Sequence, residues 1–453
     1  MAYPLENLPL HVISQILEHL GTIRQLGMTI LNHRVFYTAL RDNLHSVAGG
    51  ILTRQIPEHI LPFAVSLRES EQIKPGDHEA ISQFLPRFEE AVLDPDPTLA
   101  SLNKLSLSDY ADLSRTYAAV ESLRRGISKD AIHLVNKFGI HQLPILSQSE
   151  SFRLDRALFR YQIMCNLFCP PDASSQQDEL EELAEKYFSM FSPWVNEQLV
   201  CVYAYLERKV RETFDQLAAH DVEWGEMPIE WDEDANESPY IQWFLSQGLC
   251  FLASVARAGT YEEIVKLLQL DNLNARDSSL YPYWQLYSMV PDAGTLEPLG
   301  LEDAESILGL YKPEQLQKLS RQLYGPWDEL GTGPYLTWLG THYTKPIFNS
   351  TFSQEDWNLW DCIYVIWDIQ DRQESQMTEF WERVRQEPSM FPPYRNTWSE
   401  KEIQQSERQR TDICFAGGSG YWPRNAIEFS RIKGLSDEQK GKLITKWRKE
   451  KGT

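Results

Sequence analysis

The sequence predicts a mainly α-helical protein, on three observations. Apolar residues recur at intervals of three or four along most of the 453 residues, which is the spacing of one helix face. The hydrophobic content of 42%, with 12% aromatic residues, excludes a mainly disordered chain. No repeat with a period of 20–50 residues occurs, so neither a leucine-rich horseshoe nor a β-propeller is expected. We therefore expect a small N-terminal helical unit followed by a large, irregular α-helical body.

Residues 5–40 carry the clearest pattern in the chain. Leu8 and Pro9 form an extended entry, and proline favours a helix start because its φ angle is already helical. One helical stripe follows, made of Val12, Ile13, Ile16, Leu17 and Leu20. We expect Gly21 to end this helix in a left-handed cap conformation.

A second apolar series follows the glycine, made of Ile23, Leu26, Met28, Ile30 and Leu31, and then comes the Phe36-Tyr37 pair with Leu40. Chains of about 40 residues rarely bury a sufficient core of their own. The remaining apolar face is therefore expected to pack on the rest of the chain or on another protein.

This order of Leu-Pro, amphipathic helix, second apolar series and aromatic end resembles the F-box domain of ubiquitin-ligase receptors. The ending RVFYTAL at residues 34–40 is similar to the form common in fungal members, in which Phe-Tyr stands in place of Trp. One departure is Leu31-Asn32-His33, where the family has a Val-Ser or Cys-Arg step. The resemblance covers only about residues 3–45.

The resemblance implies a non-catalytic substrate receptor of an SCF-type ubiquitin ligase. Its N-terminal unit would bind the adaptor subunit, and through it the cullin-RING ligase, while the body recruits a protein substrate that the sequence does not name. The residues expected to contact the adaptor are Leu8, Pro9, Ile13, Ile16, Leu17, Leu20, Leu26, Phe36 and Tyr37.

The rest of the chain divides by composition. We expect an F-box-like domain at 1–45, a proline-rich helical connection at 46–97, a body at 98–430 and a basic helix or tail at 431–453. The connection ends at an Asp-Pro-Asp-Pro run, a strong helix stop, and Pro86 is a further breaker within it. An acidic surface loop at 221–239 is a candidate division of the body.

Apolar spacing and caps predict the helices of the body. Ser192 is a candidate cap for a helix that begins at Pro193, and both Thr260 to Glu263 and Ser436 to Gln439 form capping boxes. Trp357, Trp360 and Trp367, together with Tyr364, are expected on one helix face, in a core rather than in a stacking groove. The expected helical ranges are 98–139, 150–169, 178–220 with a break at 192–193, 240–258, 260–270, 301–310, 313–323 and 354–386.

Composition excludes several functional classes. The net charge of −22 argues against nucleic acid as a partner, because phosphate binding needs a basic face. The six cysteines lack zinc-site spacing and are expected to be reduced and mostly buried. No signal peptide is recognised, and the longest apolar stretch, 240–258, contains polar residues that mark a buried helix rather than a membrane span. A cytoplasmic or nuclear protein is expected.

No motif predicts an enzyme, a cofactor or a metal site. The glycine-rich segment at 416–420 lacks the Gly-Lys-Ser/Thr ending of a phosphate-binding loop, and no two histidines have metal-ligand spacing. Two alternatives remain open: a self-contained α-helical interaction or ligand-binding protein, and an enzyme whose site is assembled from residues distant in sequence. Deletion of residues 1–45 distinguishes the first alternative from a receptor. The body of a receptor should stay folded, whereas a self-contained protein should lose its whole fold.

Overall fold

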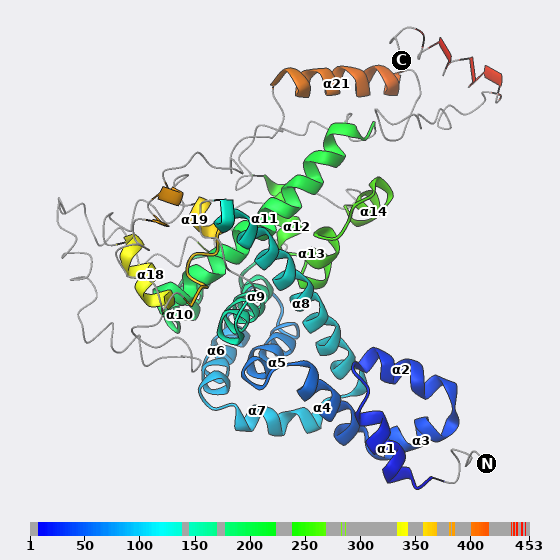
Figure 1. The fold of residues 1–453 in the computed structure, drawn as a ribbon, viewed down its shortest axis with the longest axis vertical. Coiled ribbons are helices and arrows are strands. Elements are labelled where there is room, and N and C mark those ends of the chain that lie inside the picture. The colour runs from blue at the N-terminus through cyan, green and yellow to red at the C-terminus, as the bar shows by residue number, and fades with distance from the viewer. Residues whose placement is uncertain are drawn as a thin grey trace. The chain divides into compact units, whose positions relative to one another are not determined.

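The computed structural model confirms a mainly α-helical protein (Figure 1). It describes residues 8–137, 145–169, 177–222, 238–268, 282, 286, 333–342, 357–368, 380–381, 383–385, 400–415 and single positions between 436 and 449. No strand occurs within these ranges. The helices expected at 301–310 and 313–323, the glycine-rich segment at 416–420 and most of the acidic loop at 221–239 lie outside the described residues.

The chain forms two compact units. The first comprises residues 1–205, 246–253 and 276–388, and the second comprises 206–245, 254–275 and 389–453. The boundaries expected at residues 45 and 97 both fall inside the first unit.

Twelve described helices belong wholly to the first unit. They are α1 (Leu10–Glu18), α2 (Ile23–Asn32), α3 (Arg34–Asp42), α4 (Leu44–Gln55), α5 (Leu61–Ser70), α6 (His78–Leu93), α7 (Asp96–Ser101), α8 (Leu107–Lys137), α9 (Gln148–Phe168), α10 (Gln177–Ser189), α18 (Gly333–His342) and α19 (Trp357–Asp361). Two further helices, α11 (Pro193–His220) and α13 (Leu249–Val255), contribute residues to both units. The second unit adds α12 (Pro239–Leu245), α14 (Tyr261–Leu267) and α21 (Glu400–Phe415).

Proline and glycine act differently from the sequence expectation at three places. The first helix ends at Glu18 with His19 as its cap, and Gly21 is not among the glycines with positive φ, so the expected left-handed cap is wrong. Pro86 lies inside α6 and does not end it. The stretch 240–258 forms two helices, because Gly248 adopts φ +101° and starts α13 after a turn. The stop at the Asp-Pro-Asp-Pro run is confirmed, since α6 ends at Leu93.

The expected caps have mixed outcomes. Thr260 and Glu263 form the predicted capping box at α14. The Ser436 hydroxyl accepts the Gln439 amide N–H at 3.3 Å, and the Gln439 side chain returns the bond at 2.8 Å, which confirms the second box. Ser192 does precede α11, but its buried hydroxyl has no hydrogen-bond partner, so the predicted side-chain cap is wrong.

The centre of the first unit is α9, which is buried on nearly every side. Arg153, Arg156 and Arg160 are each at most 1% exposed. Two of these guanidinium groups donate to α11: Arg156 to the Gln198 side chain at 2.7 Å, and Arg160 to the Asn196 side chain at 2.6 Å. A helix with charged residues inside the core is therefore fixed by hydrogen bonds to its neighbours.

The segment 357–368 packs on α9 and α11. The expectation of one helix over 354–386 is wrong here, because residues 362–366 form turns after α19. Ile363 has φ +47°, which is strained for a β-branched residue. Arg153 donates to the Ile366 carbonyl at 2.8 Å and pairs with Asp368 at 2.6 Å. Trp360, Tyr364 and Trp367 are buried, as expected, but not along a single helix.

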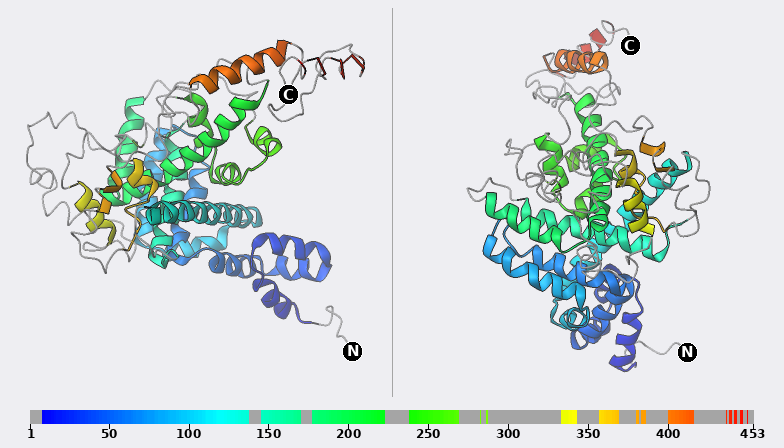
Figure 2. Two further views of the ribbon diagram at one scale, coloured as in Figure 1. Left: turned by 45° about the horizontal axis from the view of Figure 1, so that its top comes forward. Right: turned by 90° about the vertical axis from the view of Figure 1, so that its left-hand side faces the viewer.

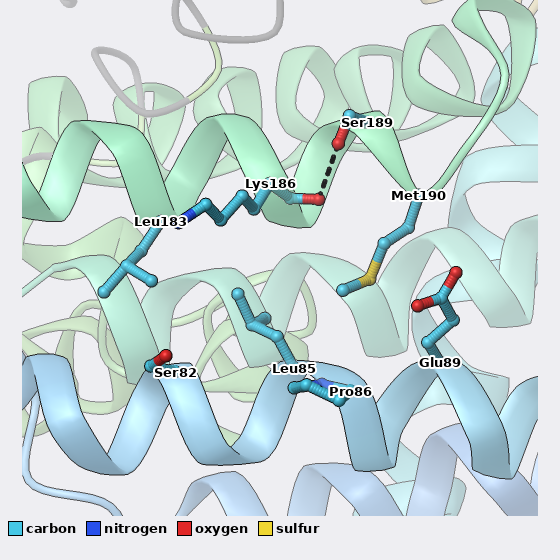
Figure 3. Close-up of a pocket in the computed structure, with 8 residues that line it drawn as sticks. All are labelled: Ser82, Leu85, Pro86, Glu89, Leu183, Lys186, Ser189 and Met190. Carbon is cyan, nitrogen blue, oxygen red and sulfur yellow. Dashed lines mark hydrogen bonds between the residues drawn. The ribbon is translucent and has the colours of Figure 1, made fainter.

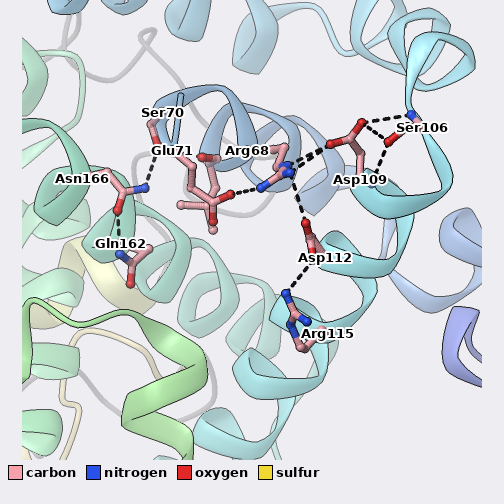
Figure 4. A network of polar contacts seen from close by, with 10 residues as sticks. Arg68, Ser70, Glu71, Ser106, Asp109, Asp112, Arg115, Gln162 and Asn166 are labelled. Carbon is pink, nitrogen blue, oxygen red and sulfur yellow. Dashed lines mark hydrogen bonds and ion pairs between the residues drawn. The ribbon is translucent and has the colours of Figure 1, made fainter. Parts of the chain in front are cut away.

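A polar network joins α5 to α8 and α9 (Figure 4). Arg68 pairs with Glu71 at 2.6 Å, Asp109 at 3.0 Å and Asp112 at 3.1 Å. Hydrogen bonds from the Ser106 hydroxyl and backbone, followed by Arg68, lower the pKa of Asp109. On the other side of α5, Asn166 donates to the Ser70 hydroxyl at 2.9 Å. These bonds fix α5 between the two long helices of the unit.

The second unit is held by packing around the end of α11. Phe214 stacks on Tyr240 with ring centroids 6.0 Å apart. The Tyr261 hydroxyl donates to Asp221, and the Ser406 hydroxyl donates to the Ala219 carbonyl. These contacts hold α12, α14 and α21 to the end of α11 within this unit.

All six cysteines are described and none is in a disulfide, in line with the expected reduced thiols, and Cys165, Cys201 and Cys362 are buried. Among the described helices, none is long and apolar enough to cross a membrane.

Candidate partner-docking surface

The candidate site is built on the first three helices, which lie beyond α4 at one end of the first unit (Figures 1 and 2). Helix α3 packs on both α1 and α2, and α1 packs on α4. Helices α2 and α4 contact α8, so the three helices are attached to the body by packing.

Short caps define where each of these helices begins. Pro9 is the N-cap of α1. The Thr22 hydroxyl accepts the Gln25 amide N–H at 3.1 Å and starts α2. His33 separates α2 from α3 in an extended conformation, and its ring nitrogen accepts the Val35 amide N–H at 3.2 Å. His33, the last residue of the stretch that departs from the F-box pattern, thus ends one helix and starts the next.

Polar bonds fix α1 against α3. The Ser14 hydroxyl donates to the Ala39 carbonyl at 3.2 Å. The Asn43 side chain donates to the Ser14 hydroxyl at 3.1 Å and to the Ala39 carbonyl at 3.2 Å. Because Ser14 and Ala39 are both buried, this three-way contact sets the spacing of the two helices from inside.

The structure divides the nine predicted contact residues by exposure. Ile13, Leu17 and Leu26 are completely buried and hold the three helices together. Leu8, Leu20 and Phe36 are half-buried, with the Phe36 ring edge-on to His33 at a centroid distance of 6.2 Å. Only Pro9, Ile16 and Tyr37 are exposed. A partner that docks on the unit as it stands reaches the last three directly, whereas the first three act by positioning helices.

Sequence reasoning omitted three exposed apolar residues from the site. Leu10 is 38% exposed on α1, and Met28 and Leu31 are 57% and 87% exposed on α2. Met28 and Leu31 are three residues apart and share one helix face. Both belong to the second apolar series, so the signal was present. That series looks like a buried stripe in the sequence because helical spacing alone does not tell which apolar residue faces water.

The exposed apolar residues concentrate on helices α1–α3. Seven large hydrophobic side chains are exposed among the described residues: Leu10, Ile16, Met28, Leu31, Tyr37, Leu93 and Ile145. Five of the seven lie on α1–α3. Three arginines and two acids make residues 10–42 slightly basic, in a chain whose net charge is −22.

Among the described residues, no group of three His, Cys, Asp or Glu side chains is placed to hold a metal ion. Apolar side chains flanked by exposed arginines are suited to contact another protein.

The comparisons with known proteins add no relative: no family model, no curated protein and no solved structure matches the chain.

Proposed function

We propose that the chain is a substrate receptor of an SCF-type ubiquitin ligase and that α1–α3 dock on the adaptor subunit. The observation that carries the proposal is the concentration of exposed large hydrophobic side chains on these three helices. Apolar side chains are rarely left exposed in groups unless they meet a partner. We take that partner to be the SCF adaptor because the order of residues 5–40 resembles an F-box domain.

Two features of helices α1–α3 support this role. Its interior is completed by Ile13, Leu17 and Leu26, so the exposed side chains are not required for its own core. Arg24 and Arg34 are exposed on the same helices and favour a partner with acidic groups. The receptor acts as a scaffold without chemistry of its own, in the cytoplasm or nucleus, and a protein substrate is recruited by the body.

Co-expression with the SCF adaptor followed by size-exclusion chromatography tests the proposal. We expect a one-to-one complex that is lost when Ile16→Asp and Tyr37→Asp are combined, because a charge buried without a partner is costly. Both side chains are exposed, at 48% and 55%, so the variant should fold. Leu17 is a poorer choice, since its substitution would damage the interior.

Leu93→Asp is the matched control. Leu93 is 58% exposed at the end of α6, outside α1–α3, and its change from an aliphatic side chain to a carboxylate repeats the change at Ile16. Co-elution of this control with the adaptor, together with loss by the Ile16 and Tyr37 variant, supports docking through α1–α3. If wild-type protein elutes alone, or if the double variant still co-elutes, the proposed function is wrong.

A further inference from the structure

A groove lies between α6 and α10 in the first unit (Figure 3). Its volume of about 340 Å³ is within the range of ligand pockets, which is about 300–1,000 Å³. Four apolar and four polar side chains line it: Leu85, Pro86, Leu183 and Met190, with Ser82, Glu89, Lys186 and Ser189. None of these residues belongs to the surface proposed for the adaptor.

The two helices run in the same direction along the groove. His78 at the start of α6 contacts Glu179 near the start of α10, with 2.7 Å between Nδ1 and Oε2. In Figure 3, Leu183 lies opposite Ser82 at one end, and Met190 lies opposite Glu89 at the other. The groove therefore has two distinct ends, with Leu85 between them.

The charges sit at opposite ends. The Lys186 side chain extends along α10 toward Leu183 and away from Glu89 (Figure 3). The ammonium group and the carboxylate are thus free to meet different parts of one ligand. Glu89 and Met190 together present a carboxylate next to an aliphatic wall.

Pro86 lines the groove from the α6 side. Proline has no N–H, so the Ser82 carbonyl oxygen receives no helical hydrogen bond from residue 86. The pyrrolidine ring lies against that oxygen, so Pro86 adds apolar surface to the wall of the groove. An apolar wall next to a carboxylate suits a peptide segment with an aliphatic side chain beside a basic one.

The surroundings favour a basic ligand. Exposed acids on the two helices outnumber the exposed bases, Arg87 and Lys186. These acids are Glu79, Glu90, Glu179, Glu181, Glu182 and Glu185. A ligand with lysine or arginine is attracted to such a surface, and an acidic one is repelled.

We propose that this groove binds a peptide segment that carries a bulky aliphatic side chain next to a lysine or arginine. The aliphatic side chain packs between Leu85, Leu183 and Met190, and the basic side chain pairs with Glu89. The inference rests on the proposed function only in taking this peptide to be a segment of the protein substrate.

An array of acetylated octapeptides tests the proposal with the purified full chain. The central residue is leucine, methionine, phenylalanine or serine, and its neighbours are lysine, arginine, glutamate or serine. We expect the chain to retain peptides with an aliphatic centre and a basic neighbour. The strongest peptide and its counterpart with glutamate in place of the basic residue are then compared by fluorescence anisotropy.

Two substitutions and a control locate the binding. Ser189→Trp fills the groove from an exposed position and should abolish binding, and Ser82→Trp serves the same purpose from α6. Glu89→Lys should lower the affinity for the basic peptide at least about tenfold, which is about 1.4 kcal/mol of binding free energy. Asp42→Lys makes the same charge change on α3 and should leave the affinity unaltered.

Retention of acidic or uncharged peptides, no retention at all, or binding that survives both tryptophan substitutions would overturn the proposal. Adaptor co-elution is measured on the same Ser189→Trp protein and should be intact. If the chain binds the peptide but not the adaptor, the groove proposal stands and the proposed function is wrong. If it binds the adaptor but not the peptide, only the groove proposal is wrong.

Discussion

At the scale of single residues, the buried charged side chains of α9 determine how the interior of the first unit is hydrogen-bonded. The Arg160 guanidinium lies 3.5 Å from the centre of the Phe191 ring and donates to the Val195 carbonyl at 3.1 Å. Burial lowers the pKa of Arg160 to about 10, so the group stays charged at neutral pH. A charged group held this way leaves several unsatisfied acceptors behind when it is removed.

Arg160→Ala should therefore cost about 3 kcal/mol or more of the free energy of unfolding, from the cavity and from the acceptors left unpaired. Urea denaturation followed by circular dichroism measures it. The matched change Arg125→Ala removes an exposed arginine that pairs with Glu121, and it should cost less than about 1 kcal/mol. Equal costs for the two variants would show that the buried arginine is not held as described.

The buried carboxyl group of Asp155 should make the stability of the chain depend on pH. Its carboxylate pairs with Arg124 at 2.6 Å, yet burial dominates and raises its pKa to about 7. The unfolded value is about 3.9, so between these values the folded chain holds a proton that the unfolded chain has lost. Asp155 therefore contributes a loss of stability as pH rises from about 4 to about 7.

Asp155→Asn fixes a neutral side chain at this position and should reduce that loss. The variant should gain stability relative to wild-type protein as pH is raised through this window. Thermal unfolding at several pH values measures the difference. A difference between the two proteins that does not change with pH would contradict the raised pKa.

At the scale of elements, helix packing depends on glycine at one close approach. A Cβ atom on Gly126 of α8 would lie 2.3 Å from the Tyr205 hydroxyl oxygen and 3.3 Å from Cζ of its ring. Tyr205 belongs to α11 and is buried, so its ring has little room to move. Glycine lowers helix propensity, but here it permits two long helices to meet.

Gly126→Ala should destabilise the chain by about 1–3 kcal/mol through overpacking, despite a helix-propensity gain of about 1 kcal/mol. The Tyr205→Phe background removes the hydroxyl and should relieve most of that cost. A double-mutant cycle from denaturation midpoints gives the coupling. Additive effects would show that Gly126 and Tyr205 do not meet.

The elements also show what the sequence could and could not predict. Local signals predicted the helices well: the capping box at Thr260, the break before Pro193 and the stop at the Asp-Pro-Asp-Pro run all lie in the described structure. The burial of Arg153 was not predictable, because charged residues normally face water and its partner Asp368 lies far along the chain. The turn at Ile363 was missed because apolar residues and tryptophans there continue a helical spacing.

At the scale of the whole molecule, the first unit is assembled from distant parts of the sequence. Residues 357–368 pack on helices of the first 205 residues, and Trp360 donates to Glu197 at 3.1 Å. No local pattern predicts such packing. The sequence placed the proposed docking surface on the first three helices, whereas the exposure of Leu10, Met28 and Leu31 could be read only from the structure.

The central claim is that the exposed apolar residues of α1–α3 bind the SCF adaptor, and titration calorimetry with the purified adaptor tests it most directly. We predict one-to-one binding with a negative heat-capacity change, the mark of buried apolar surface. Met28→Asp combined with Leu31→Asp should lose at least about 2 kcal/mol of binding free energy, and Ile145→Asp, at a position 84% exposed outside these helices, should bind as wild-type protein does. Absence of binding by the wild-type chain, or equal affinities for all three proteins, would contradict the account.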